Sequence, residues 1–272
     1  MPHLKTAEHL QSAKFSEANA KIEALKDHPV ISQWLANGRK VYSFDLLSGY
    51  SCPFAKDCLA KAVQIGNTRK VQDGPDMKFR CFSASQEAQY PNVYNLRKKN
   101  FDAIRQCDTS DEMAKEINHA LPKKAGVIRI HVAGDFFNFK YLLAWCKVAK
   151  MNPNVLFYAY TKSLKFWIQA DAKNLIPDNL VLTASRGGRL DHLIELENLR
   201  ETIVVHSEEE AAKLGLEIDH DDSHAANPEN RQNNFALLIH GTQAKGSAAA
   251  EALKILKRNK VRHSYSRKAA SV

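Results

Sequence analysis

Three of the five cysteines lie in one short segment. Cys52, Cys58 and Cys81 follow the spacing C-x5-C-x22-C, with Pro53 after the first. Three thiolates can hold a [4Fe–4S] cluster and leave one iron open, or hold zinc together with a fourth ligand. An odd number of cysteines argues against a disulfide framework. The alternative is that one or two of the three are simply buried thiols. The other two, Cys107 and Cys146, lie in stretches of helical spacing, and we expect them in the core.

Three pairs of residues follow apolar runs and could bind a cofactor. Gly134-Asp135 offers close backbone approach and a carboxylate for an amino group. Thr161-Lys162 and Ser185-Arg186 offer hydroxyls for a ribose and cations for a carboxylate or phosphate. The alternative for Asp135 is a residue that only initiates a helix. The alternative for Thr161-Lys162 and Ser185-Arg186 is that they are ordinary polar residues of exposed loops.

Arg129 and His131 share one face of an apolar strand whose other face carries Ile128, Ile130 and Val132. An unpaired buried charge is costly, so this face needs a partner or a ligand. We expect both side chains to point to a ligand. The alternative is an internal ion pair of Arg129, for example with Asp45.

Histidines and carboxylates are dense near the carboxyl end. A loop contains Asp219-His220-Asp221-Asp222-Ser223-His224, and His206 and His240 follow neighbouring apolar runs. Such groups can bind a divalent metal or transfer protons. One candidate metal site therefore comprises His206, His220, Asp222, His224 and His240. An acidic solvated loop with incidental histidines is an equal alternative.

The elements that must position these groups are six short apolar runs with helical spacing between most of them. They span residues 41–46, 127–134, 155–162, 180–186, 202–206 and 235–240. Strands that alternate with helices indicate parallel βα units, whose sites lie at the carboxyl ends of the strands.

A complete eight-stranded barrel takes about 250 residues. Six strands in 272 residues therefore predict a partial (β/α)6 TIM-like barrel of the α/β class. We expect a helical extension over residues 1–40 and a barrel over 41–245 with an irregular, cysteine-rich loop at 48–91. A basic helix and tail would follow at 246–272.

The formal charge of +9 favours a polyanionic partner such as a nucleotide or nucleic acid. Much of the excess lies near the carboxyl end, where a solvated helix face is an even alternative. No apolar run approaches the roughly 20 residues that span a bilayer, and the start lacks the apolar core of a signal peptide. We expect a cytoplasmic protein with no membrane association; the sequence does not predict the oligomeric state.

The order of parts resembles the radical S-adenosylmethionine superfamily, which has a six-stranded partial βα barrel and three cluster-binding cysteines after its first strand. Its signature spacing is C-x3-C-x2-C. The resemblance implies that Cys52, Cys58 and Cys81 ligate a [4Fe–4S] cluster whose open iron binds S-adenosylmethionine. By position it also implies contacts to the cofactor, with Gly134 and Asp135 at its amino group, Ser185 at its ribose and Arg186 at its carboxylate.

Five stretches also resemble a family of phage and prophage proteins named only for a numbered gene product, with no activity to carry over. They read FDLLSGYSCPFAKDCLAKA, RIHVAGDFFN, FYAYTKSL, LTASRGG and EIDHDDSH. This resemblance implies a mobile-element origin and makes the modification or handling of nucleic acid more plausible.

Three functional hypotheses follow. The first is a radical enzyme whose cavity is lined by Arg129, His131 and Lys162, with His220 and His224 in proton transfer or covering the substrate. The second is a metal-dependent hydrolase or nuclease with structural zinc on the cysteines and a catalytic ion on the histidine-rich set. The third is a non-catalytic nucleic-acid-binding protein that works through its basic tail.

Overall fold

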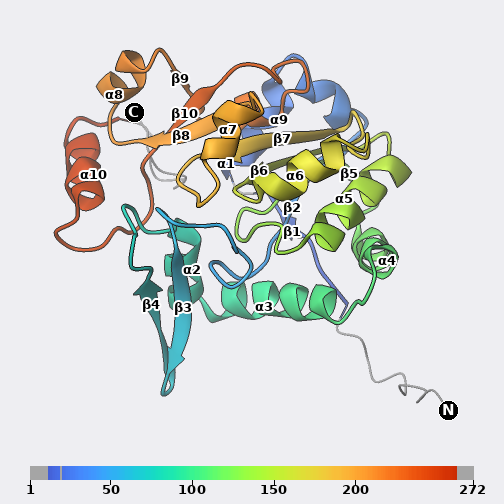
Figure 1. The fold of residues 1–272 in the computed structure, drawn as a ribbon, viewed down its shortest axis with the longest axis horizontal. Coiled ribbons are helices and arrows are strands. Elements are labelled where there is room, and N and C mark those ends of the chain that lie inside the picture. The colour runs from blue at the N-terminus through green and yellow to red at the C-terminus, as the bar shows by residue number, and fades with distance from the viewer. Residues whose placement is uncertain (1–11, 19, 262–272) are drawn as a thin grey trace.

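A computed structural model describes residues 12–18 and 20–261, and its centre is an eight-stranded sheet (Figure 1). Its strand order is β1-β2-β5-β6-β7-β8-β10-β9. The pairs from β2 to β9 are parallel, and only β1 runs antiparallel to its neighbour. The strands are β1 (Ser16–Glu17), β2 (Lys40–Phe44), β5 (Ala125–Ile130), β6 (Leu156–Thr161), β7 (Leu180–Ser185), β8 (Glu201–Val205), β9 (Glu217–Ile218) and β10 (Phe235–Leu238).

All six predicted strands are present, and they neighbour one another in chain order as β2, β5, β6, β7, β8 and β10. The sheet is open, with β1 and β9 at its edges, so it does not close as a TIM barrel does. The fold is therefore mixed α/β with a mostly parallel central sheet.

Helices connect the parallel strands and cover the sheet. The long ones are α3 (Pro91–Arg105), α4 (Ser110–Ala120) and α5 (Phe139–Met151), with α6 (Leu164–Asp171) and α7 (His192–Leu196) further along the chain. Every residue of β5 is buried, as expected for a strand covered on both faces. Phe44 and Trp145 belong to the core cluster on one side of the sheet, and Leu25, Tyr158 and Phe235 belong to the cluster on the other.

Two helix starts follow from local capping chemistry. The Thr109 side chain accepts the Glu112 backbone N–H while the Glu112 carboxylate accepts that of Thr109, which is a capping box at the start of α4. The Asn138 carboxamide oxygen caps α5 by accepting the N–H of Tyr141. The second cap begins α5 after the segment 131–138 that follows β5.

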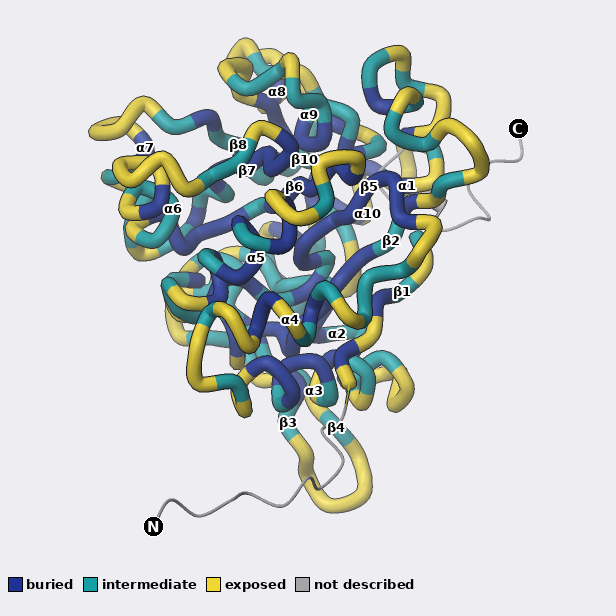
Figure 2. Tube along the Cα trace, turned by 90° about the vertical axis from the view of Figure 1, so that its right-hand side faces the viewer, coloured by how far each residue is buried: buried dark blue, intermediate teal, exposed yellow. Residues whose placement is uncertain are grey.

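The segment 48–91 is more ordered than expected. It contains the antiparallel hairpin of β3 (Ala60–Ile65) and β4 (Thr68–Asp73), followed by α2 (Phe82–Gln89). The two-residue turn Gly66-Asn67 joins the strands, and glycine at such a position is a hairpin signal. The interpretation as an irregular loop missed it. The hairpin projects from the body of the protein (Figures 1 and 2).

The two chain ends are only partly described. The expected amino-terminal helical extension consists of short pieces, α1 (Ala20–Glu23), η1 (Ala24–Asp27) and η2 (Ile31–Leu35), besides β1. The expected basic helix is α10 (Ala248–Arg258). Residues 1–11, 19 and 262–272, which include part of the predicted basic tail, lie outside the described residues.

None of the described helices is long and apolar enough to cross a membrane. The remaining helices are α8 (Glu208–Lys213) and α9 (Ser223–Ala226).

Candidate active site

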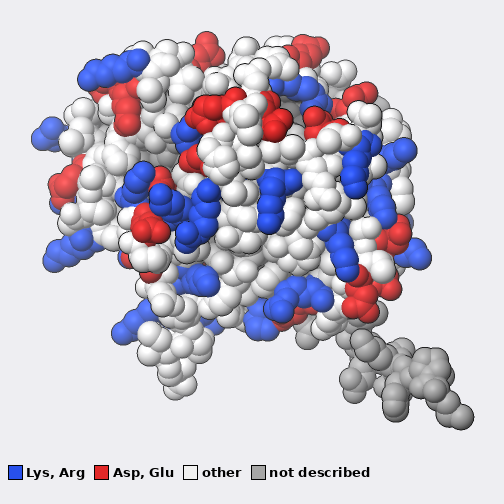
Figure 3. All heavy atoms as spheres, in the orientation of Figure 1, with Lys and Arg blue, Asp and Glu red and all other residues white. Residues whose placement is uncertain are grey.

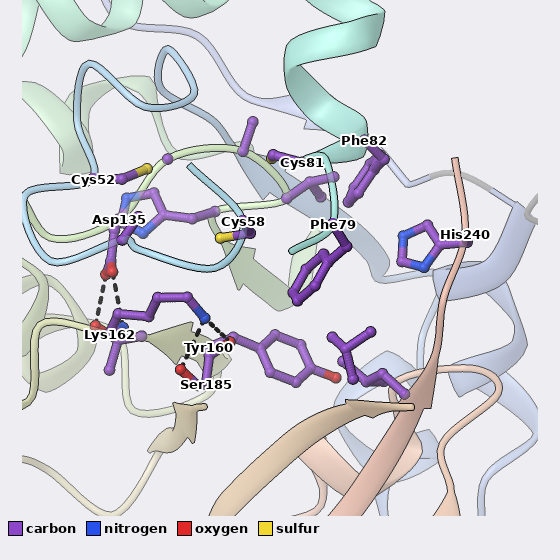
Figure 4. A pocket seen from close by; sticks show the side chains of 18 of the residues that line it. Cys52, Cys58, Phe79, Cys81, Phe82, Asp135, Tyr160, Lys162, Ser185 and His240 are labelled. Atoms are coloured by element: carbon purple, nitrogen blue, oxygen red, sulfur yellow. Dashed lines mark hydrogen bonds between the residues drawn. The ribbon is translucent and has the colours of Figure 1, made fainter. Parts of the chain in front are cut away.

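A cavity of about 170 Å³ lies at the carboxyl ends of the parallel strands. Cys52, Cys58 and Cys81 all line it. So do most of the other residues singled out from the sequence, namely Arg129, His131, Gly134, Asp135, Thr161, Lys162, Ser185, Asp222 and His240. In Figure 4 the three cysteines lie along the upper side of the cavity and Lys162, Ser185 and Tyr160 along its lower side. The fold thus brings together residues that are far apart in the chain: Cys52 and His240 are separated by 188 positions.

Cys52 lies in the loop after β2, which is fixed by a buried ion pair. The Glu87 carboxylate of α2 accepts the backbone N–H and the hydroxyl of Ser48 at 3.0 and 2.8 Å, and Arg97 pairs with the same oxygen at 3.1 Å. The backbone N–H of Gly49 donates to the Cys52 sulfur at 3.3 Å. Burial raises the pKa of the Cys52 thiol well above its usual range, and the negative charge of Asp135 adds to this.

Cys58 is held against the loop that follows β7. The backbone N–H groups of Lys56 and Asp57 donate to the Gly187 carbonyl at 3.3 and 2.9 Å. Gly187 has a φ of +95°, and a Cβ there would lie 3.0 Å from the Asp57 Cβ, so the sequence needs glycine at this contact. Burial raises the pKa of Cys58 to about 11, although the positive charge of Lys162 opposes the rise.

Cys81 is positioned by the chain that follows β10. The side-chain amide of Gln243 accepts the backbone N–H of Arg80 at 2.7 Å and donates to the Arg80 carbonyl at 3.1 Å. A Cβ on Gly241 would lie 2.4 Å from the Phe82 Cβ, so the two segments are in close contact. Each of the three cysteines is therefore fixed by a different part of the fold.

Asp135 organises the ends of two strands. Its buried carboxylate accepts the Thr161 hydroxyl at 2.6 Å and the backbone N–H groups of Lys162 and Phe136 at 2.9 and 2.7 Å. Burial raises the pKa of Asp135 to about 6, and these hydrogen bonds oppose the rise. A Cβ on the preceding Gly134, whose φ is +99°, would lie 2.7 Å from the Ser51 hydroxyl. Gly134 thus permits close contact with the cysteine loop.

Lys162 is buried, and hydrogen bonds to oxygens of the chain after β7 hold its ammonium group. Its Nζ donates to the Ser185 hydroxyl at 2.7 Å and to the carbonyls of Ser185 and Arg186 at 2.8 and 3.0 Å. Arg186 itself does not line the cavity, because its guanidinium pairs with Glu201 and Glu195. Of the two cations expected to follow β6 and β7, Lys162 therefore lines the cavity, whereas Arg186 forms ion pairs outside it.

Arg129 forms an internal ion pair, but Asp45 is not its partner. Its Nη1 lies 2.5 Å from the Asp222 Oδ2, and Tyr158 donates its hydroxyl to the same oxygen at 3.0 Å. Asp45 instead accepts the backbone N–H of Val132 at 2.7 Å. Of the two alternatives for Arg129, the structure contains the internal ion pair, with Asp222 in place of Asp45 as the partner, because the long loop before α9 brings Asp222 back over β5.

His131 is a neutral imidazole in the wall of the cavity. Its Nε2 lies 2.9 Å from the Tyr141 hydroxyl, and burial with the nearby charge of Arg129 lowers the pKa of His131 to about 3. His131 has a φ of +68°, a backbone conformation that residues other than glycine rarely adopt. Residues in such conformations are concentrated at functional sites.

The alternative metal residues are spread over several places. Asp222 and His240 line the cavity, whereas His206 and His220 do not. His224 lies 2.9 Å from Glu217 and 3.8 Å from Asp219. Within residues 12–18 and 20–261, no three His, Cys, Asp or Glu side chains form a group that could hold a single metal ion.

Several residues of the cavity were not singled out from the sequence. Besides aliphatic side chains such as Val204, Leu237 and Ile239, they include the aromatic or basic Phe79, Arg80, Phe82 and Tyr160. The Arg129 guanidinium lies 5.2 Å above the Tyr160 ring, and the rings of Phe82 and His240 are 4.7 Å apart. Phe79, Arg80 and Phe82 flank Cys81 directly, so their proximity to a candidate ligand was the signal that could have found them.

Comparisons with known proteins point to phage relatives. The sequence profile of a family described as "Gene product 88" matches residues 7–261. The "Gene 88 protein" of Mycobacterium phage L5 is 29% identical over 142 residues, which cover 49% of this chain and 51% of the relative. The "Gene 88 protein" of Mycobacterium phage D29 is 30% identical over 122 residues, which cover 42% and 43%. The chain spans about half the length of the curated relatives it matches. These matches support a bacteriophage origin, and no solved structure matches the chain significantly.

Proposed function

The chain belongs to the Gene product 88 family, and we propose that it is an iron–sulfur enzyme of the radical S-adenosylmethionine type. One observation carries the proposal: the three cysteines of segment 48–91 line the same cavity as Gly134-Asp135 and Ser185. The six parallel strands in chain order beneath the cavity support relating the open sheet to the partial barrel of that superfamily.

The cysteines suit a [4Fe–4S] cluster. The thiolates of a cluster bind separate irons, so they need not converge on one ion, and three of them leave the fourth iron open. Burial raises the pKa values of Cys52 and Cys58, so a bound cationic group is what would favour their thiolate form. When bound, the cluster would supply the electron that splits S-adenosylmethionine into methionine and a 5′-deoxyadenosyl radical, which abstracts hydrogen from the substrate.

The chain's own residues would bind and orient the cofactor. Gly134 lets a ligand approach the backbone at the end of β5. Asp135 fixes Thr161 and Lys162 and remains a carboxylate beside which the amino group of S-adenosylmethionine can bind. Lys162 orients the Ser185 hydroxyl for the ribose. Its positive charge serves the cofactor carboxylate, the role first assigned to Arg186.

A second set of residues would hold the substrate side of the cavity and exclude water. Arg129 and Asp222 form the buried pair described above, and the hydroxyls of Tyr158 and Tyr160 point to the same carboxylate at 3.0 and 3.4 Å. His131, neutral across the physiological range, can accept or donate a hydrogen bond without adding charge. The net charge of +9 supports a nucleotide or nucleic-acid substrate.

The test is iron and sulfide content, with an ultraviolet–visible spectrum, on protein purified without oxygen. We expect about four irons per chain, lost in a Cys52→Ala/Cys58→Ala/Cys81→Ala variant. Cys107→Ala is the matched control, because Cys107 does not line the cavity, and it should keep the iron. The iron-loaded protein, given a strong reductant and S-adenosylmethionine, should release methionine and 5′-deoxyadenosine.

Zinc on the same cysteines without iron would overturn the proposal and favour the metal-dependent hydrolase or nuclease. Iron that survives in the triple variant would equally contradict it, because the metal would then bind elsewhere. Equal loss of iron in Cys107→Ala would show that the variants act through general instability.

A further inference from the structure

A basic groove lies directly beside the cavity. It is lined by Arg69 and Lys70 of β4, Arg80, Ser85 and Gln89 of the following segment and α2, and Thr242 after β10. Arg80 lines both the groove and the cavity, so the two are neighbours. A ligand that extends along the groove therefore reaches the side of the cavity on which Phe79 and Phe82 lie.

Two chain segments that supply the groove carry an excess of positive charge. Residues 48–105 hold ten Lys and Arg against five Asp and Glu, and residues 241–261 hold five against one. Residues 106–240, which form most of the sheet and its helices, hold 15 against 19. Figure 3 shows Lys and Arg side chains between α10 and the base of the β3–β4 hairpin, with some acidic ones among them. The excess of positive charge thus belongs to the two chain segments that supply the groove and not to residues 106–240.

The groove residues are held in place. Arg69 donates to the Glu87 carbonyl at 3.2 Å and its guanidinium lies 4.6 Å above the Tyr94 ring. Arg80 pairs with Asp73 through two hydrogen bonds. Lys70, the next residue of β4 after Arg69, is exposed. Ordered arginines beside an exposed lysine suit a chain of phosphates, since arginine presents fixed donors and lysine a mobile charge.

Aromatic side chains extend this surface into the cavity. Phe79 and Phe82, close to Arg80 in the sequence, line the cavity together with Tyr160, and Phe79 packs against the apolar cluster that includes α10. Proteins that bind single strands combine a basic track for the backbone with aromatic rings on which bases stack. An enzyme that acts on a base also needs that base outside a duplex.

We propose that single-stranded nucleic acid is the substrate, with its phosphates along Arg69, Lys70 and Arg80 and one base directed into the cavity beside Phe79. This inference rests on the proposed function for its chemistry, but the binding itself does not require a cluster. DNA and RNA share the phosphate and base chemistry that the groove recognises.

The test is fluorescence anisotropy with labelled single strands of about 20 nucleotides, one of DNA and one of RNA, and with the matching duplexes. Affinity should fall as salt rises from about 50 to 200 mM, with each phosphate contact adding about −0.7 to the logarithmic slope. Arg69→Glu/Lys70→Glu should weaken single-strand binding about tenfold or more and reduce the slope by about 1–2. Lys70→Glu alone keeps the Arg69 contacts and should show a smaller loss in the same direction.

The matched control is Lys123→Glu/Lys124→Glu, which makes the same charge change at exposed positions just before β5, at the opposite ends of the strands. Equal weakening in this control would overturn the inference, because binding would then follow net charge alone. Duplex binding as tight as single-strand binding would overturn the choice of single strands. No binding of any oligonucleotide at low salt would overturn the groove as a nucleic-acid site and point to an acidic protein partner.

The two proposals fail separately. The unmodified protein, assayed in iron-loaded and iron-free preparations, should bind the single strand equally well, because the groove residues Arg69, Lys70 and Arg80 are not cluster ligands. If the protein purified without oxygen contains no iron but binds the single strand, the cluster is refuted and the groove is retained. If iron-loaded protein cleaves S-adenosylmethionine but does not bind the single strand, the groove is refuted and the cluster is retained.

Discussion

The guanidinium of Arg129 lies 2.5 Å from the carboxylate of Asp222, although the two residues are 93 positions apart in the chain. The Arg129 side chain is 11% exposed and that of Asp222 only 1%. This contact fastens the histidine-rich loop over the end of β5. Asp222 has a φ of +67°, and His131, on the same cavity wall, has a φ of +68°. Two residues other than glycine in this conformation mark the wall as a place where the fold accepts local strain.

Removal of one partner from this pair should destabilise the protein strongly. Asp222→Ala leaves the Arg129 charge buried without its carboxylate, and the expected loss is about 3–5 kcal/mol of unfolding free energy. The measurement is urea unfolding at neutral pH. Arg129→Met/Asp222→Leu, which removes both charges, should recover part of the loss. A double variant as unstable as the single variant would show that the ion pair is not the cause.

Gly134→Ala should cost more than the left-handed backbone alone explains. Its Cβ would lie 2.7 Å from the Ser51 hydroxyl and 2.8 Å from the Leu46 Cβ. Gly38→Ala is the matched control, because Gly38 also has a positive φ, +74°, but no atom within 4 Å of its added Cβ. The control should lose about 1–2 kcal/mol, as expected for the conformation itself. Gly134→Ala should lose more, and its iron content should fall, since the cysteine loop must move. Equal losses would remove the close-contact argument.

His224 should make stability depend on pH. Asp219 and Glu217 raise the pKa of His224 to about 9, from about 6.5 in an unfolded chain. The folded state therefore binds the proton more tightly, so the stabilisation is complete below pH 6.5 and is lost as pH rises through about 9. Unfolding free energies of His224→Gln and the unmodified protein should differ at pH 6 and converge at pH 9.5. A difference that is constant over this range would show that protonation of His224 contributes nothing.

Binding of S-adenosylmethionine should follow the ionisation of Asp135. Burial raises the pKa of Asp135 to about 6, so the carboxylate that faces the cofactor's amino group forms as pH rises through that value. Affinity, measured by calorimetry on iron-loaded protein, should increase between pH 5 and 7. Asp135→Asn should bind more weakly, because an amide nitrogen cannot accept the Lys162 N–H, and it should lose this pH dependence. Unchanged affinity in the variant would remove Asp135 from the cofactor site.

Much of this arrangement follows from the sequence, and the rest depends on tertiary contacts. The sequence by itself determined the six parallel strands, because alternating and continuous apolar runs are local patterns. It also determined which residues end the strands, and hence that Gly134, Asp135 and Ser185 would share a rim with the cysteine segment. It did not reveal the open sheet, since closure depends on how the edge strands meet. Nor did it show that Arg129 pairs with Asp222. It also did not show that Arg186 forms ion pairs outside the cavity, whereas Lys162 lines the cavity. Those outcomes depend on the paths of long loops, and a buried charge takes whichever partner the folded chain brings within reach.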